Sequence, residues 1–251
     1  EIFECLAFGL SQLSFVALQL APVDPDDSAL TQLQQALERL GVDCHRRFKF
    51  YNWFHRTHQQ SFTDYFNQRP ARLRNTIVRK QRKLEREHEC KIQLFRGDEA
   101  ACAMADYAEV YGKSWKAEEQ FAHIMPRLVS RLCALDWIRL GLLTIDQQPA
   151  AAQIWFVVNR RASIFRLAYD EAWKQYSPGS ILTEHIMRYV FEQDQIQEID
   201  FLMGNEQYKQ DWMSERRERW SLTFSPSRRN TADRHWLLKI IHQWWSKAVR
   251  H

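Results

Sequence analysis

The sequence predicts a mixed α/β fold in which helices cover both faces of a central sheet. Three observations lead to this expectation. The chain of 251 residues is 45% hydrophobic and 13% aromatic, which is enough apolar side chain for a large core. It has only seven Gly and seven Pro, so long regular elements joined by short turns are expected. Finally, strand-like and helix-like segments alternate, and helix-separated strands favour parallel pairing whereas hairpins favour antiparallel pairing.

The N-terminal part predicts a β-α-β unit. A strand-like segment at 15–23 is followed by a breaker of Pro and Asp residues, by a helix over 29–40 with Ser28 as the expected N-cap, and by a strand over 42–53. We interpret this unit as a partial, degenerate repeat of the fold that follows. A long basic helix is expected next, over 61–87.

From residue 91 onward, the predicted element order is β-α-α-β-β-β-α-β-α-β. The expected strands are 91–96, 137–145, 150–158, 162–169, 196–203 and 220–224. The expected helices are 99–111, 119–135, 178–192 and 205–213, and a last, tryptophan-rich helix is expected over 233–249. We therefore expect three parts: residues 1–88, 89–225 and 226–251.

The five cysteines are scattered along the chain and include no Cys-x-x-Cys pair, and the histidines lack the spacing of a zinc site. No metal is predicted, and a reducing cytoplasm is the expected location. The apolar segment 2–20 is interrupted by polar residues and lacks the features of a signal peptide or a membrane span. Because the chain begins at Glu1 without Met, we expect it to be a piece of a longer protein.

The start of the helix at 178–192 is a candidate anion site. Ser177 is the expected N-cap and Pro178 the first helical residue. The backbone N–H groups of Gly179, Ser180 and Ile181 are then expected to lack helical partners, which suits a pyrophosphate. An ordinary capped helix is the alternative, because the same residues cap a helix without any ligand.

Four motifs, taken in order, resemble one known family. They are Tyr169-Asp170 at a strand end, Ser177-Pro178-Gly179 at a helix start, Asp200-Phe201 followed by Gly204, and Tyr208-Lys209. Together they resemble the CelD-like acetyltransferases of the GNAT superfamily, a family of cellulose and exopolysaccharide biosynthesis related to the Fem peptidoglycan aminoacyltransferases. Segments 71–86 and 114–116 add to the resemblance. Met203 departs from it, since a smaller residue is usual there.

The resemblance implies a GNAT-like acyl-CoA N-acyltransferase fold and direct transfer of an acetyl or acyl group from acyl-CoA to an amine. The implied acceptor is a small-molecule amine such as an amino sugar or a precursor of cell-surface polysaccharide or peptidoglycan, met in the cytoplasm or at the inner membrane. The implied donor-binding residues are Ser177, Pro178, Gly179, Ser180, Ile181 and Leu182. The implied acceptor-binding residues are Arg166, Tyr169 and Asp170.

Three residues are candidates for the chemistry, which requires a deprotonated amine and a polarised thioester carbonyl. Asp200 is the candidate general base, or the residue that orients the amine. Lys209 is the candidate for holding a phosphate or the developing oxyanion, and Tyr208 is the third candidate. The alternatives are a strand-end carboxylate bonded to a turn, a solvated lysine, and a tyrosine packed beside Trp212.

Two further segments suggest partners. Seven Lys and Arg residues between Arg72 and Arg86 form either a solvated face or a surface for a polyanion or an anionic membrane. The helix at 233–249 either lies in a membrane interface or packs against its own domain or a second copy of the chain. Two other functions stay open: a Fem-like transferase that uses aminoacyl-tRNA, and a catalytically silent GNAT-like binding module.

Overall fold

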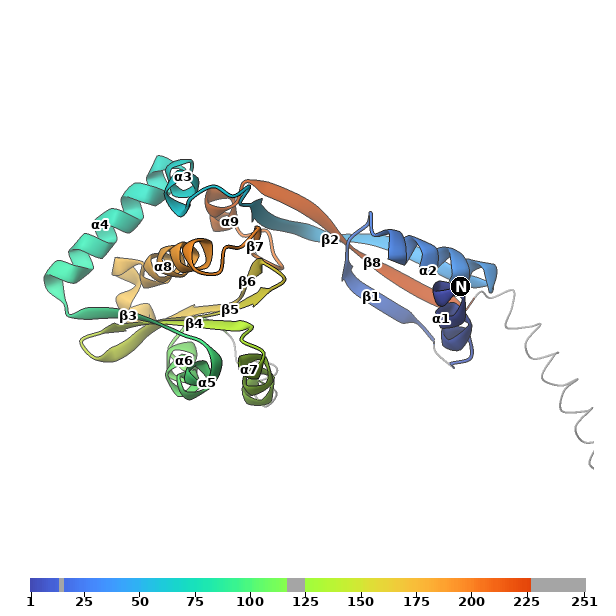
Figure 1. The fold of residues 1–251 in the computed structure, drawn as a ribbon, viewed down its shortest axis with the longest axis horizontal. Coiled ribbons are helices and arrows are strands. Elements are labelled where there is room, and N and C mark those ends of the chain that lie inside the picture. Colours follow the sequence, from blue (N-terminus) through green and yellow to red (C-terminus); the bar gives the residue numbers. More distant parts are fainter. Residues whose placement is uncertain (14–15, 117–124, 227–251) are drawn as a thin grey trace, which may run out of the picture. The chain divides into compact units, whose positions relative to one another are not determined.

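A computed structural model describes residues 1–13, 16–116 and 125–226 of the chain (Figure 1). The helices are α1 (Ile2–Ser11), α2 (Ser28–Arg39), α3 (Phe62–Asn67), α4 (Ala71–Glu87), α5 (Gly97–Cys102), α6 (Met104–Gly112), α7 (Met125–Ala134), the 3-10 helix η1 (Glu171–Tyr176), α8 (Pro178–Glu192) and α9 (Tyr208–Trp212). The strands are β1 (Leu18–Val23), β2 (Val42–Arg56), β3 (Cys90–Phe95), β4 (Ile138–Ile145), β5 (Gln148–Val158), β6 (Arg161–Tyr169), β7 (Glu198–Asp200) and β8 (Glu215–Pro226).

The chain divides into two compact units. One consists of residues 1–51 and 218–251, and the other of residues 52–217. The described strands are hydrogen-bonded in the order β1-β8-β2-β7-β6-β5-β4-β3, and β2 and β8 each contribute residues to both units. The unit borders near residues 51 and 217 therefore differ from the expected boundaries at 88 and 225.

In the smaller unit, α1 and α2 pack with β1 and the adjoining parts of β2 and β8. Leu37 and Phe224 are fully buried in this core, together with Ala7 of α1, a helix that the sequence did not predict. The expected N-cap of α2 was wrong by one residue, because Asp27 caps the helix by accepting hydrogen bonds from the backbone N–H groups of Ala29 and Leu30.

The larger unit has three layers. Helix α8 lies on one face of strands β4 to β6, and helices α5, α6 and α7 lie on the other (Figure 1). Because successive side chains of a strand point to opposite faces of the sheet, each strand contributes to both cores. Leu143 and Trp155 pack on the α8 side, whereas Leu142 and Ile154 pack on the other. The expectation of helices on both faces is confirmed.

The sheet is mixed, as predicted. Strands β3, β4, β5 and β6 pair with their neighbours in antiparallel fashion, and β6 pairs with β7 in parallel across the crossover helix α8. A parallel pair needs such a crossover, whereas the antiparallel pairs β4–β5 and β5–β6 are joined by short turns and β3 reaches β4 through α5, α6 and α7. The order of elements and this topology confirm the predicted mixed α/β fold.

Several predicted helices differ from those in the structure. The single helix expected over 61–87 is two helices, α3 and α4, because Pro70 disfavours helical backbone at the residue before it. The helix expected over 99–111 is divided into α5 and α6 at Ala103, and the helix expected over 205–213 is the five-residue α9. Part of the helix expected over 119–135, and all of that over 233–249, lie outside the described residues.

Candidate functional site

The start of α8 differs from the expected capped helix. Ser177 occupies the N-cap position but has left-handed backbone (φ 54°), and its side chain makes no capping hydrogen bond, so the expectation of a serine cap was wrong. Two of the three N–H groups expected to be unpaired, those of Ser180 and Ile181, donate to the Ser177 carbonyl at 3.0 and 3.2 Å. Within the described ranges, the Gly179 N–H is left without a partner, which leaves one backbone donor for a ligand.

Gly179 is needed because α8 begins directly against the end of β6. A Cβ atom at this position would lie 3.2 Å from Cδ1 of Tyr169 and 3.7 Å from Cδ2 of Leu167. A side chain there would therefore have to displace the Tyr169 ring, which itself lies 4.5 Å from the ring of Trp115, centroid to centroid. Gly179 thus allows the start of α8 to pack closely against Tyr169, and the residue is buried.

A buried glutamine that sequence reasoning missed fixes the first turn of α8. Gln153 on β5 donates from Nε2 to the Gly179 carbonyl at 2.9 Å and to the Thr183 hydroxyl at 2.8 Å. Its Oε1 accepts from the indole N–H of Trp155 at 2.8 Å, so every polar atom of this fully buried amide is used. The signal in the sequence is a single amide inside an otherwise apolar strand, a position that requires such partners.

Strands β6 and β7 separate beyond their first pairs. Their parallel register runs only from Arg161 opposite Glu198 to Ser163 opposite Asp200, although β6 continues to Tyr169. A bulge at Phe165 bends β6 at this point, because Arg166 and Ile164 face successive residues of β5. In the part of the chain described, residues 164–169 therefore have no β7 partner, and their backbone offers an edge to an extended, amide-containing ligand.

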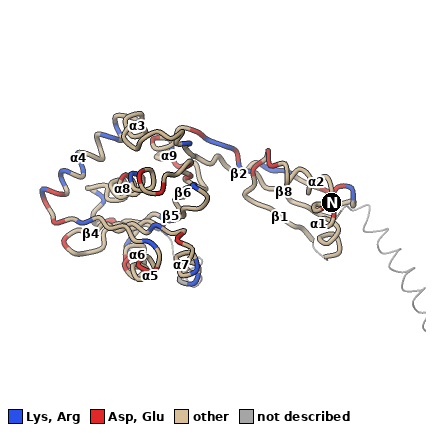
Figure 2. Tube along the Cα trace, viewed as in Figure 1, with Lys and Arg blue, Asp and Glu red and all other residues tan. Residues whose placement is uncertain are grey.

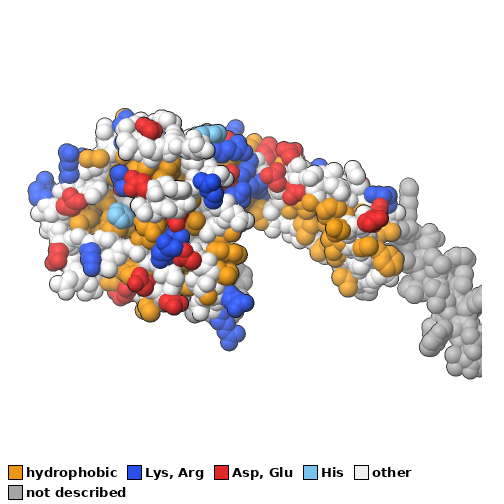
Figure 3. All heavy atoms as spheres, in the orientation of Figure 1, with side chains coloured by type: hydrophobic (Ala, Val, Ile, Leu, Met, Phe, Trp, Pro, Cys, Tyr) orange, Lys and Arg blue, Asp and Glu red, His pale blue; other side chains and the backbone are white. Residues whose placement is uncertain are grey.

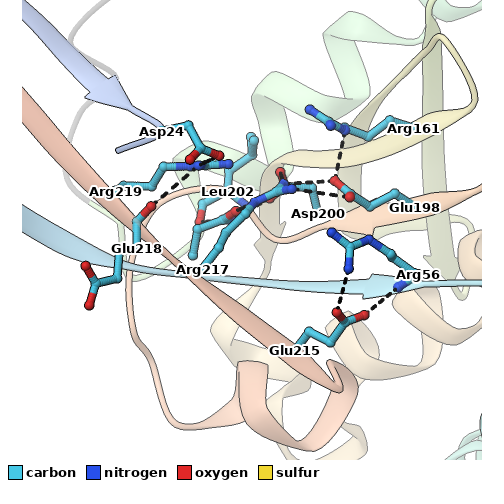
Figure 4. Close-up of polar contacts among 11 residues, drawn as sticks. Asp24, Arg56, Arg161, Glu198, Asp200, Leu202, Glu215, Arg217, Glu218 and Arg219 are labelled. Atoms are coloured by element: carbon cyan, nitrogen blue, oxygen red, sulfur yellow. Dashed lines mark hydrogen bonds and ion pairs between the residues drawn. The ribbon is translucent and has the colours of Figure 1, made fainter. Parts of the chain in front are cut away.

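Asp200 is engaged by three donors at the end of β7 (Figure 4). Its carboxylate accepts from Nδ2 of Asn52 at 2.6 Å, from the backbone N–H of Leu202 at 2.7 Å and from the guanidinium of Arg217 at 2.6 Å. The residue is only 5% exposed. This arrangement favours an anchoring role over that of a general base, since each bond occupies a lone pair that an incoming proton would need.

Arg217 holds the acidic end of β7 together. Its guanidinium also bonds to Glu198 at 2.8 Å, and its Nε donates to Oδ1 of Asn52 at 2.7 Å. Burial acts against the charge of Arg217, but the bonds and charges of Glu198 and Asp200 outweigh it and raise its pKa. Neither Arg217 nor Asn52 was singled out from the sequence, because their partners lie far away along the chain.

Lys209 is buried rather than solvated. Only 3% of it is exposed, and its ammonium donates to the carbonyls of Phe201 at 3.1 Å and of Met203, and pairs with Glu206 at 2.8 Å. Asp200 and Lys209 thus hold the same loop, 201–203, from two sides.

Tyr208 and Trp212 have different environments, although both lie on α9. Trp212 is buried in the core, whereas Tyr208 is 47% exposed with its ring 6.1 Å from that of Phe201. Partial burial and the charge of Glu206 raise the pKa of Tyr208 to about 12, so its hydroxyl carries a proton at neutral pH.

The three expected acceptor-binding residues do not converge on one point. Tyr169 packs against Gly179, and Asp170 caps η1 by accepting from the N–H of Ala172 at 2.9 Å. The guanidinium of Arg166 lies 4.5 Å from the ring centre of Phe165, on the bulge of β6.

Helix α4 carries many of the Lys and Arg positions that are blue in Figure 2. It borders an open hollow of about 1040 Å³. Lys80 donates to the carbonyl of Gln175, and Lys83 and Arg86 pair with Glu87. Three other cations that line the hollow have no partner among the residues described: Arg72, Arg79 and Arg82. Basic side chains are also visible on this part of the surface in the space-filling view (Figure 3).

Among the residues that the structure describes, no group of three or more His, Cys, Asp or Glu side chains is arranged to hold a metal ion. None of the helices described combines the length and the apolar character that crossing a bilayer requires.

Comparisons with solved structures find the same fold at low sequence identity. FemX shares 8% identity with a TM-score of 0.64, over 88% of this chain and 75% of FemX. L-PGS from Bacillus licheniformis shares 11% identity with a TM-score of 0.56, over 96% of this chain and 77% of L-PGS. A protein of unknown function from Bacteroides thetaiotaomicron shares 10% identity with a TM-score of 0.59, over 90% of this chain and 76% of the other.

A comparison with curated proteins finds no match. A family model described as the acetyltransferase (GNAT) domain, however, matches residues 71–210, which is more than half of the chain. The matched segment contains α4, β6, α8, β7 and the first three residues of α9, and therefore all of the site residues predicted from the sequence. The chain belongs to the GNAT acetyltransferase family.

Proposed function

We propose that this protein is an acyl-CoA-dependent N-acyltransferase of the CelD-like branch of the GNAT superfamily. The observation that supports the proposal best is the start of α8, where Gly179 leaves one backbone N–H unpaired at the point where β6 and β7 separate. The glycine also lets this turn pack closely against Tyr169, because a Cβ atom would lie 3.2 Å from Cδ1 of that ring. A helix N-terminus beside an open strand edge suits a donor that combines a pyrophosphate with an extended, amide-containing arm, as coenzyme A does.

In this proposal, Ser177, Pro178, Gly179, Ser180, Ile181 and Leu182 hold the donor. The backbone N–H of Gly179 and the positive end of the α8 dipole attract the pyrophosphate, and the edge of β6 pairs with the amides of the pantetheine arm. Gln153 keeps the first turn of α8 in place through the Gly179 carbonyl. The acceptor amine then approaches the thioester from the side of Tyr169, Asp170 and Arg166.

The reaction itself is direct aminolysis. The amine nitrogen attacks the thioester carbonyl carbon, the new C–N bond forms, the C–S bond breaks, and the sulfur leaves with a proton as the thiol of coenzyme A. Tyr208 is the proposed source of that proton, because its hydroxyl carries one at neutral pH, and the proton that the attacking nitrogen loses restores the hydroxyl. Asp200 and Lys209 shape the loop 201–203 that orients the amine.

The proposed acceptor is an amino sugar or a precursor of cell-surface polysaccharide or peptidoglycan, reached in the cytoplasm or at the inner face of the membrane. A screen of such amines for release of coenzyme A from acetyl-CoA tests the activity, and a thermal shift with acetyl-CoA tests the donor. At 100 times its Kd, a ligand that binds only the folded state stabilises it by about 2.7 kcal/mol. No shift with any acyl-CoA would instead favour a silent GNAT-like module.

A second candidate donor is aminoacyl-tRNA, because Arg72, Arg79 and Arg82 have no partner among the residues described and can contact backbone phosphates. Exchanging Arg79 and Arg82 for Glu tests it, and exchanging Arg127 and Arg131 on α7 for Glu is the control with the same change in charge. Salt-dependent tRNA binding that is lost only in the α4 variant favours the second donor, whereas equal losses in both variants point to unspecific attraction.

A further inference from the structure

A chain of four hydrogen-bonded polar side chains includes Tyr176, the residue directly before the N-cap of α8. Oδ2 of Asp146, in the β4–β5 turn, lies 2.7 Å from Nδ1 of His88, and Nε2 of His88 lies 3.0 Å from the hydroxyl of Tyr176. That hydroxyl lies 2.9 Å from Oε2 of Glu87 at the end of α4. Tyr176 is the last residue of η1, so this chain joins the end of α4 and the β4–β5 turn to the residue that precedes Ser177.

The chain lies in a confined aromatic environment. Tyr176 is only 3% exposed, and about a quarter of the His88 side chain is accessible. The His88 ring makes edge-on contacts with the rings of Trp173 and Tyr176, at centroid distances of 5.0 and 5.3 Å. Packing therefore fixes the imidazole with each nitrogen facing one partner.

Counting hydrogens shows which protonation state completes the chain. Both ends are carboxylates, which only accept when they are ionised, and the Tyr176 hydroxyl has one hydrogen. If that hydrogen goes to Glu87, as the 2.9 Å contact indicates, Nε2 of His88 must donate to the Tyr176 oxygen while Nδ1 donates to Asp146. Both ring nitrogens then carry hydrogen, so all three bonds exist together only when His88 is an imidazolium.

The surrounding charges keep both carboxylates ionised. Arg86 bonds to Glu87 at 2.6 Å, and the Lys83 ammonium lies 3.7 Å from the same carboxylate and 4.9 Å from the ring centre of Tyr176. The bond from Arg86, followed by that from Tyr176, lowers the pKa of Glu87. The bond to His88 lowers the pKa of Asp146, which also accepts from the backbone N–H of Glu89 at 3.1 Å.

We propose that His88 is a positioning residue whose imidazolium form closes this chain and fixes Tyr176, so that the start of α8 is held more firmly at mildly acidic than at alkaline pH. When His88 is neutral, one bond is lost. The Tyr176 hydroxyl then has two possibilities. It either donates to Nε2 of His88 and loses its bond to Glu87, or it keeps the bond to Glu87, and lone pairs on its oxygen and on Nε2 face each other. The identity of the donor at α8 rests on the proposed function, whereas the pH-dependent chain does not.

A double-mutant cycle tests the chain in the full protein. Unfolding by urea is followed for the wild type, His88→Leu, Tyr176→Phe and the double variant at about pH 5.5 and about pH 8. Because a hydrogen bond from a charged donor is about twice as strong as one from a neutral donor, the coupling free energy between the two positions is expected to be about twofold larger at the acidic pH. Coupling that is absent, equal at both pH values, or larger at alkaline pH overturns the proposal.

His88→Gln is the conservative variant, because its amide retains an N–H near the Nε2 position but does not titrate. Its coupling to Tyr176 is expected to persist and to be the same at both pH values, and a coupling that still changes with pH contradicts the role of His88. If His88→Leu does not fold, the urea midpoints of the wild type and Tyr176→Phe decide. Their difference must be larger at acidic pH, and a constant difference overturns the proposal.

Binding of acetyl-CoA separates this inference from the proposed function. Tyr176→Phe is expected to weaken binding at about pH 5.5 more than at about pH 8, while His45→Gln, at an exposed position of the smaller unit, leaves binding unchanged at both. An equal loss at both pH values contradicts a pH-dependent hold on the donor helix. A wild type that binds no acetyl-CoA refutes the donor, and the urea cycle then decides the chain alone.

Discussion

At the scale of single residues, buried polar groups of this protein are held by partners that lie far away along the sequence. Asp200 is bonded to Asn52 and Arg217, and Gln153 to Gly179. A buried charge is tolerated only when such partners satisfy it, so removing one partner costs more than the bond itself contributes. This difference makes several of these residues sensitive to substitution.

Arg217→Leu is expected to lower the free energy of unfolding by about 3 kcal/mol, because Asp200 and Glu198 would remain buried without their shared cation. Urea unfolding measures the change. Arg219→Leu is the matched control, since its partner Asp24 is 45% exposed and the loss should stay below about 1 kcal/mol. Equal losses in the two variants would show that the end of β7 does not depend on Arg217.

His55 makes stability depend on pH. It is 4% exposed, and burial, together with the positive Arg69, lowers its pKa from 6.5 to about 4. Between these values the unfolded chain binds a proton that the folded protein excludes, so stability is present above pH 6.5 and is lost as the pH falls towards 4, by about 3 kcal/mol. His55→Gln should lack this loss in urea unfolding, and stability curves that stay parallel with the wild type would contradict the assignment.

At the scale of elements, the close approach of α8 to the sheet depends on a glycine in β4. A Cβ atom at Gly141 would overlap Cδ1 of Ile186 and lie 2.9 Å from its Cγ1, and Ile186 is fully buried. Helix α8 therefore rests on β4 at a position where a methyl group has no room. The start of α8 and the donor site attached to it depend on this packing.

Gly141→Ala is accordingly expected to cost about 1–3 kcal/mol of stability through overpacking. Gly112→Ala at the end of α6 is the control, because nothing lies within 4 Å of its new methyl group, and alanine there should be neutral or stabilise by up to about 1 kcal/mol. Thermal or urea unfolding of both variants decides. A Gly141→Ala variant as stable as the wild type would mean that α8 does not pack so closely.

The elements themselves were mostly predictable from the sequence, and the errors have physical causes. Period-two patterns predicted the strands of the larger unit. The helical segment between two predicted strands also predicted the parallel crossover at α8. The break at Pro70 and the left-handed Ser177 were missed, since an apolar stripe and a favourable cap residue each suggested a continuous pattern. Helix α9 begins later than predicted, because the residues expected as its first turn belong to the loop that Lys209 holds through the Phe201 carbonyl.

At the scale of the whole chain, the sequence alone indicated the family but not the long-range contacts that surround the candidate residues. The order of Tyr169-Asp170, Ser177-Pro178-Gly179 and Asp200-Phe201 indicated the GNAT superfamily, and the match over residues 71–210 confirms that superfamily. The roles of individual residues stay predictions. Long-range contacts such as Arg217 with Asp200, or His88 with Tyr176, leave no periodic signal in a single sequence, so the pattern could not separate anchoring residues from chemical ones.

The most direct test of the account is the affinity of the protein for acetyl-CoA, measured by isothermal titration for the wild type and for Gly179→Val. The account predicts one site per chain in the wild type and binding weaker by roughly tenfold or more, about 1.4 kcal/mol, in the variant, whose side chain fills the space beside Tyr169. Gly112→Ala should bind as the wild type does. Wild-type protein that binds no acyl-CoA, or a Gly179→Val variant that binds it equally well, would contradict the assignment of the donor site to the start of α8.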